Sequence, residues 1–393
     1  MIIDKFPVRE AAERFMRDHP DVRVEVKAKD CKGFAQTYLL MWSEKRTTVD
    51  LGIGGMAMQL APLVGADLLI DLGDVLMGPM AKDRFVDSFL SAARFVGKDG
   101  QPYYPVLPFM GEVMTLNVNK TFWDKIGALD EQGSPKAPKD WDELEDLLTK
   151  LTQAAPAQGL RVDWGWNFIL YSYAGGILAL KGDIYGPDGN MLDVESDAAL
   201  RWLEMNRRWI EKGIAAEGTI TDVNFGRDNF NAGIIPMIYT AHSRFIEGGA
   251  DLGEENTSAI PLPGALDNGT IVYTHTIYVP KASPNQELAK QFIQEQIFSK
   301  WFQQWSYNRY GKLPVITEFY EDLGWYVDEA AMMLKMAENG VYMPKYRGSE
   351  ELLDIFLEHI HGVLLGLKSP AEGLAAIRKD IETRKVDLTR LDI

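Results

Sequence analysis

The spacing of hydrophobic residues changes repeatedly along the chain between the period of a helix and that of a strand. In residues 4–18 apolar side chains recur three or four positions apart, which predicts an amphipathic helix, whereas residues 20–26 alternate apolar and polar like a strand. A helix over 33–45, a buried strand over 49–53 and a helix after Gly54-Gly55 continue the series. Alternating strands and helices predict an α/β fold with a mostly parallel sheet.

Two helices with recognisable caps follow a strand after Pro108. Asn119 or Thr121 can cap a helix that stops at Gly127, because their side chains accept from free N–H groups and glycine readily ends a helix. Asp140 can cap the next helix, with Glu143 three residues later completing a capping box. The strand before them is expected to carry the chain from one lobe to another.

The rest of the pattern predicts further elements of the same kinds. Residues 258–263 are punctuated by proline and lead into a return crossing between lobes, and 311–315 are expected to form a third crossing. Helices are expected over 141–154, 197–212, 227–232, 284–299, 350–367 and 370–383, and strands over 235–239 and 272–279.

Composition narrows the class of protein. A chain of 393 residues with 46% hydrophobic residues exceeds what one core usually holds, so two lobes are expected. The formal net charge of −16 argues against nucleic acid or an anionic membrane as a partner. Cys31 is the single cysteine, which excludes an intramolecular disulfide or a zinc ribbon. No apolar stretch has the ~18 residues of a membrane span, and the given sequence shows no signal peptide.

Five phrases along the chain resemble those of one family. They are Val118-Asn119-Lys120-Thr121-Phe122-Trp123-Asp124-Lys125-Ile126-Gly127, Phe230-Asn231-Ala232-Gly233-Ile234-Ile235-Pro236-Met237, and the segments 282–292, 311–315 and 369–374. In this order they resemble the extracellular solute-binding proteins of ABC importers, family 1, the maltose-binding-like group. Val118 stands where the family has a tyrosine, and Pro236 where it has an alanine.

This resemblance implies a fold and a division of the chain. The expected fold is the class II periplasmic-binding-protein fold, with two α/β lobes, a hinge and a ligand cleft between the lobes. The N-terminal lobe is then expected to comprise residues 1–112 and 264–314, and the C-terminal lobe residues 113–263 and 315–393.

Aromatic rings and carboxylates suggest what the cleft binds. A pyranose stacks its C–H face on a ring and needs donors and acceptors for its hydroxyls. By resemblance, Glu112, eight residues before Lys120, is the strongest candidate, and Glu112→Ala is expected to weaken binding more than about tenfold with little effect on unliganded stability. The other candidates are Asp4, Lys5, Gly54, Gly55, Trp164, Trp166, Asn167, Tyr239, His242, Arg244, Tyr273, His275, Tyr346 and Arg347.

Other chemistries find little support. Gly52-Ile53-Gly54-Gly55 departs from a dinucleotide fingerprint, although N–H groups at Gly54 and Gly55 could still face the cleft. His359 and His361 would lie on roughly opposite faces of a helix, so a shared metal ion is not expected. Tyr103-Tyr104 is favoured as structural. No Gly-x-Ser-x-Gly occurs. We therefore expect neither an enzyme, nor a cofactor, nor a metal.

The resulting hypothesis is the substrate-binding component of an ABC importer, which closes on a carbohydrate, most simply an oligosaccharide, by hinge motion. It would be a monomer in the periplasm or outside the cell, with the membrane permease subunits as partners. One alternative is a non-sugar solute such as a polyamine or phosphodiester, since Arg244 and Arg347 favour an anion whereas Glu112 and Asp163 favour a polyol or cation. A carbohydrate-active enzyme is the other.

Overall fold

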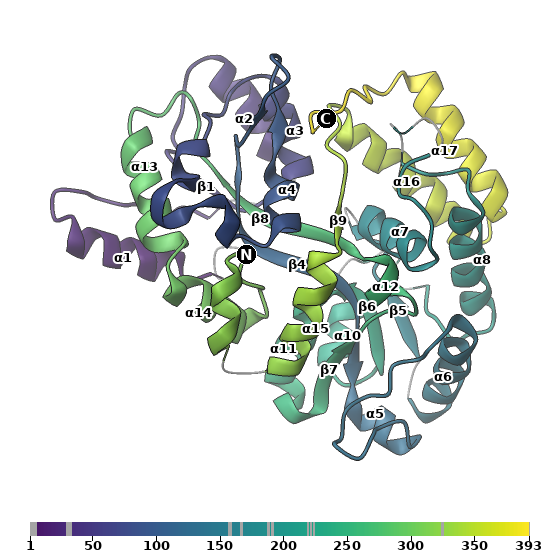
Figure 1. Ribbon diagram of the computed structural model, residues 1–393. Coiled ribbons are helices and arrows are strands. Elements are labelled where there is room, and N and C mark those ends of the chain that lie inside the picture. The colour runs from purple at the N-terminus through teal and green to yellow at the C-terminus, as the bar shows by residue number, and fades with distance from the viewer. Residues whose placement is uncertain are drawn as a thin grey trace.

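The computed structural model describes residues 6–28, 34–155, 159–165, 168–186, 189, 192–217, 220, 222, 225–323 and 326–392. Its central element is a long strand, β4 (Leu107–Asn119), whose side chains are all buried. Along its first half β4 pairs with β8 (Ile271–Tyr278), and along its second half with β6 (Met237–Ala241) and β7 (Thr257–Ile260). This change of partner carries the chain from one lobe into the other (Figure 1).

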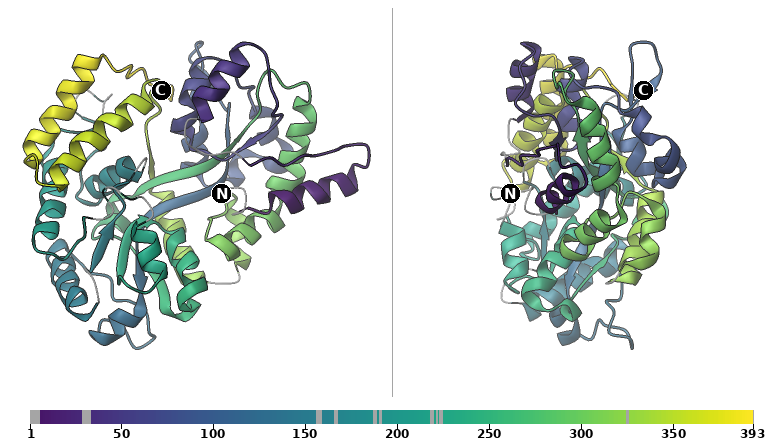
Figure 2. Two further views of the ribbon diagram at one scale, coloured as in Figure 1. Left: turned by 180° about the vertical axis from the view of Figure 1, so that it is seen from behind. Right: turned by 90° about the vertical axis from the view of Figure 1, so that its left-hand side faces the viewer.

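The lobe that contains the N-terminus lies on the left in Figure 1 and on the right in the reversed view of Figure 2. Its sheet consists of β1, β8 and the first half of β4, while β2 and β3 pair separately. The bounds of its other elements are α1 (Val8–Asp18), α2 (Phe34–Ser43), β1 (Gly52–Ile53), α3 (Ala57–Gly65), α4 (Asp87–Ala93), β2 (Phe95–Val96), β3 (Pro102–Tyr103), α13 (Gln286–Phe292) and α14 (Lys300–Tyr310).

The second lobe is built around the other half of β4 and is covered by helices on its outer side (Figure 1). Between the lobes run α15 (Val327–Glu338) and β9 (Val341–Tyr342), which pairs with β8. The bounds of the remaining elements are α5 (Lys120–Lys125), α6 (Trp141–Ala154), β5 (Leu160–Val162), α7 (Phe168–Ala179), α8 (Asp197–Glu211), α10 (Phe225–Asn231), α11 (Ser243–Leu252), α12 (Ala265–Asn268), α16 (Ser349–Leu364) and α17 (Pro370–Arg384).

The prediction of a mostly parallel sheet is wrong. Around β4 all pairs are antiparallel, and β1 is also antiparallel to β8; within the described residues the parallel pairs are β5 with β6 and β8 with β9. The physical reason is that β4 leaves the first lobe and β8 returns to it, so the two central strands run in opposite directions. The sheet is therefore mixed.

Helix boundaries follow local capping chemistry closely. The Asn119 side chain accepts from the N–H of Thr121 (3.1 Å), and Gly127 takes a positive φ of 67° just after α5. Asp140 caps α6 as predicted, accepting from the N–H of Glu143 (2.8 Å). The capping box is different, however, because the Glu143 carboxylate accepts from the N–H of Lys139 (2.9 Å).

Two other expectations are corrected. The predicted strand over 20–26 has no ladder partner in the described structure, although its valines remain more buried than the polar residues between them. The helix predicted over 284–299 is α13 followed by a π-helical turn, Ile293–Ile297. None of the described helices combines the length and apolar character that a bilayer span requires.

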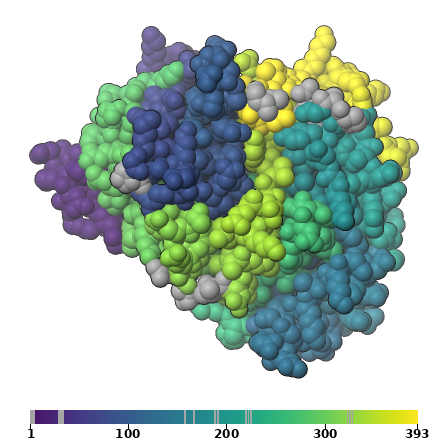
Figure 3. Space-filling view, in the orientation of Figure 1, coloured from purple at the N-terminus to yellow at the C-terminus, as the bar shows by residue number. Residues whose placement is uncertain are grey.

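On the face drawn in Figure 3, atoms of the two lobes meet, with later parts of the chain packed between them. One hydrophobic cluster accordingly contains buried side chains from both lobes, such as Phe15 and Trp202. A second cluster, around Trp42 and Leu60, belongs to the N-terminal lobe.

Candidate functional site

Three extended segments converge where the lobes join. They are β4, β8 and residues 311–315, of which Leu313 exchanges backbone hydrogen bonds with Gly111 of β4 (2.9 and 3.0 Å). Beside them α11 begins in the second lobe. Two buried residues at its start, His242 and Ser243, contact these segments.

Glu112 lies at the centre of this convergence with 1% of its surface exposed. Its Oε1 accepts from His275 Nε2 (2.8 Å) and from the Lys312 ammonium, while Oε2 accepts from the Ser243 hydroxyl (2.7 Å). Tyr273 lies opposite Glu112 in the β4–β8 ladder, close enough for the charge of this carboxylate to affect its hydroxyl. Lys312 in turn donates to Ser243 Oγ (3.0 Å), so the group forms one connected network.

Electrostatics keep this carboxylate ionised. Burial by itself would raise the pKa of Glu112, but Lys312 and the hydrogen bond from His275 outweigh it and hold that pKa well below its usual value. The same negative charge, added to burial, raises the pKa of Tyr273.

His242 joins two of the segments in a defined tautomer. Its Nδ1 accepts from the N–H of Val113 (3.1 Å), so the proton is on Nε2, which donates to the carbonyl of Gly311 (2.5 Å). Burial lowers the pKa of His242 to about 4, so the ring is neutral at pH 7.

A second group of charges lies next to this network. Arg244 and Arg227 both pair with the buried carboxylate of Glu247 (2.5 and 3.0 Å). Burial would lower the pKa of Arg244, but Glu247 and Glu112 outweigh it and raise that pKa. Asp163 accepts from Thr240 (3.0 Å), and burial raises its pKa to about 6 against the opposing effects of Thr240 and Arg244.

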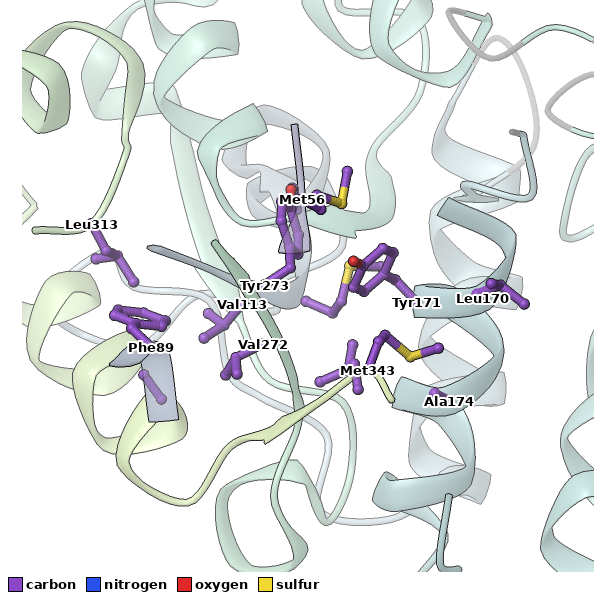
Figure 4. Close-up of a cluster of buried hydrophobic side chains, with 14 of the residues drawn as sticks. Met56, Phe89, Val113, Leu170, Tyr171, Ala174, Val272, Tyr273, Leu313 and Met343 are labelled. Atoms are coloured by element: carbon purple, nitrogen blue, oxygen red, sulfur yellow. The ribbon is translucent and has the colours of Figure 1, made fainter. Parts of the chain in front are cut away.

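Aromatic and methionine side chains from both lobes lie next to these polar groups. Tyr171 reaches from α7 toward Tyr273 of β8, with ring centroids 4.9 Å apart, and Met56 and Met343 lie beside them (Figure 4). The Phe168 ring stands edge-on to Tyr273 at 6.0 Å. Met56 follows β1 in the N-terminal lobe, so residues of both lobes form this group.

The structure brings together some of the residues predicted from the sequence. Glu112, His242, Arg244, Tyr273 and His275 belong to the network just described. Whether they contact a ligand stays a prediction. Asp4, Lys5, Trp166 and Asn167 lie outside the described residues, as does Cys31.

Other predicted residues lie elsewhere. Trp164 and Tyr239 are buried in the core of the second lobe, each about 6 Å from the Trp202 ring (6.2 and 6.1 Å). Tyr346 is buried with 1% exposed, and the Arg347 side chain lies next to Gly65 at the end of α3.

The glycine turn is also different from the expectation. The N–H of Gly54 donates to the carbonyl of Thr276 (2.8 Å), and the carbonyl of Gly55 accepts from the N–H of the same residue (3.1 Å). The idea that Gly54 offers a free N–H to a ligand is therefore wrong. These two hydrogen bonds hold the turn to β8, and both turn residues have a positive φ (115° and 81°), which glycine adopts readily.

Sequence reasoning missed the main partner of Glu112. Lys312 is 200 positions away from Glu112 in the chain and lies inside the phrase Gly-Lys-Leu-Pro-Val. The indication available in the sequence was that a lysine stands within a segment predicted to cross between the lobes. Ser243, immediately after His242, carried no signal of its own.

Surface hollows and a possible metal cluster lie away from this region. A hollow of about 480 Å³ lies between α8 and α17, lined by residues such as Leu200 and Leu374, and one of about 360 Å³ lies between α6 and α8. Glu358, His359 and Asp380 are close together, but Arg384 bonds both carboxylates and Lys368 lies 2.6 Å from His359 Nδ1. His361 points elsewhere, to the carbonyl of Trp164 (2.7 Å).

The arrangement of two lobes joined by extended segments is also found in other solved structures. Two solved structures share the fold: T. maritima MalE3 with maltose bound (TM-score 0.80, 17% identity, 96% of this chain and 95% of that one) and the GacH receptor of Streptomyces glaucescens GLA.O, solved unliganded and with acarbose (TM-score 0.79, 18% identity, 96% and 94%).

A family model described as bacterial extracellular solute-binding protein matches residues 7–302, so the chain belongs to that family. The resemblance noted in the sequence is thereby confirmed. No curated protein matches the sequence significantly.

Proposed function

We propose that the protein is the substrate-binding component of an ABC importer and that it binds a neutral carbohydrate between its lobes. Family membership supports a binding protein rather than an enzyme. Both structural neighbours carry names that report maltose or acarbose as ligand. The permease subunits of the importer would be its partners, and its place of action would be the periplasm or the cell exterior.

The observation that carries the proposal is the pairing of rings with polar groups where the lobes meet. Tyr171 and Tyr273 can stack on the C–H face of a pyranose once the lobes separate. Among the neighbouring polar groups, the Asp163 carboxylate can accept hydrogen bonds from sugar hydroxyls and the Arg244 guanidinium can donate to them.

Charge balance favours a neutral ligand over a polyamine or a phosphodiester. Among the residues of the two charged groups described above, three acidic side chains are matched by three basic ones, so their formal charges cancel. The acids are Glu112, Asp163 and Glu247, and the cations are Arg227, Arg244 and Lys312.

The test is a thermal-shift screen with mono- and oligosaccharides, with a polyamine and a phosphodiester as charged comparisons. We expect a rise in the melting temperature with a sugar, because a ligand that binds only the folded state stabilises it by mass action. The sugar should be recovered unchanged after incubation; cleavage would establish the enzyme alternative. A shift with a charged compound alone would contradict the proposal.

The variant Tyr171→Ala tests whether this aromatic ring stacks on the sugar. Loss of one stacked ring should weaken sugar binding at least about tenfold by calorimetry, because aromatic contacts contribute about 0.5–1.5 kcal/mol beyond the buried area. Tyr103→Ala, in the separate β2–β3 pair of the first lobe, is the matched control and should bind normally. Equal affinities of the two variants would remove Tyr171 from the site.

A further inference from the structure

Each of the three connections between the lobes contributes to the contacts of one carboxylate. β4 carries Glu112 itself, β8 carries His275, and residues 311–315 carry Lys312. The third contact, Ser243, is the first residue of α11 in the second lobe.

This carboxylate has little remaining capacity for a ligand. An ionised carboxylate offers about four lone-pair sites. Lys312, His275 and Ser243 occupy three of them, and Glu112 is only 1% exposed. A sugar hydroxyl could reach this carboxylate only after the buried side chains around it had moved.

We propose that Lys312 is a positioning residue that, through Glu112, pins the three connecting segments to the start of α11, so that the lobes move about this point. The inference rests on the proposed function only in taking lobe movement as part of ligand binding. Glu112 then acts as a joint between the lobes and not as the ligand acceptor expected from the resemblance.

The ion pair of Lys312 and Glu112 is important for stability because both side chains are buried. The side chain of Lys312 is 4% exposed and that of Glu112 is 1% exposed. Removing one partner of such a pair leaves an uncompensated buried charge, which is strongly destabilising, whereas replacing both by neutral groups of similar volume is often nearly neutral. Backbone pairing of Leu313 with Gly111 places the two side chains on adjacent segments.

The experiment compares Lys312→Met, Glu112→Gln and the double variant without ligand. Spin labels at the exposed positions Glu13 and Lys150, one on each lobe, report the distribution of interlobe distances after Cys31→Ser. We expect each single variant to lower the thermal midpoint by at least about 5 °C and to broaden the distance distribution. The double variant should recover at least half of both changes.

The exposed pair Lys281–Asp67 is the matched control, and Lys281→Met with Asp67→Asn should change neither quantity. A lower midpoint with unchanged distances would overturn the proposal, because the pair would then be ordinary core structure. Weaker sugar binding by Glu112→Gln with an unchanged midpoint would also overturn it and restore the ligand-acceptor role. Since the unliganded protein is measured, a failure of the sugar hypothesis does not affect this result.

Discussion

His242 and Asp163 are both buried, yet protons affect them in opposite ways. Burial disfavours the charged form of each side chain, so it lowers the pKa of the histidine to about 4 and raises that of the aspartate to about 6. Their neutral forms are therefore the ones that the surrounding structure stabilises.

As the pH is lowered from about 6.5 to about 4, His242 should reduce the free energy of unfolding of the protein. In this window the unfolded chain binds a proton that the folded protein excludes, which contributes a loss of up to about 1.4 kcal/mol per pH unit. Urea unfolding across this range should show a shallower loss for His242→Gln, whose side chain is neutral.

Asp163→Asn is the companion measurement. The folded protein binds a proton at Asp163 between about pH 6 and its usual pKa of 3.8, so this residue adds stability as the pH falls through that window. The variant should therefore lose stability more steeply than the wild type. Parallel curves for all three proteins would contradict both assignments.

At the scale of elements, the sequence predicted the helices better than the strands. α6 was predicted with its observed limits, because Asp140 and the N–H groups that it caps are neighbours in the chain. The alternation over 20–26 correctly indicated that one side of this segment is more buried than the other. A strand also needs a pairing partner, and such partners are distant in the sequence.

The joint between α6 and α8 depends on one carboxylate. Glu145 accepts from Trp209 Nε1 (2.9 Å), from Arg208 (2.6 Å) and from Lys212, and these hydrogen bonds outweigh burial and lower its pKa to about 2. Glu145→Ala should reduce the free energy of unfolding by about 2 kcal/mol in urea titrations.

Glu211→Ala is the control for this prediction. Glu211 pairs only with Arg207 among the described ion pairs and its side chain is 55% exposed, so its loss should change stability by less than about 0.5 kcal/mol. Equal effects of the two substitutions would show that Glu145 does not hold the helices together.

At the scale of the molecule, the C-terminal segment 386–392 contacts both lobes. The carbonyl of Leu391 accepts from the N–H of Val96 in the first lobe (2.8 Å). Arg390 lies over the Tyr185 ring in the second lobe (4.4 Å) and donates to its hydroxyl (2.9 Å). In Figure 1 the C-terminus accordingly stands between the two lobes.

A chain that ends at Lys385 should therefore hold its lobes together less firmly. Hydrogen exchange at the amide of Val96 should rise at least about tenfold, since its acceptor is gone. Arg384→Ala is the control, because its partners Glu358 and Asp380 lie on the same lobe as itself. Unchanged protection of Val96 in the shortened chain would show that the segment does not join the lobes.

The sequence by itself determined most of the helices, the caps at Asn119 and Asp140, the α/β class and, through five short phrases, the family. These features depend on residues within a few positions of each other or on order along the chain. Only the tertiary structure decided the direction of the central strands, the burial of Trp164 and Tyr239 in a core, and the meeting of Glu112 with Lys312. Such contacts join residues that are far apart in the chain, and a local pattern of hydrophobic and polar residues does not specify which distant residues will meet.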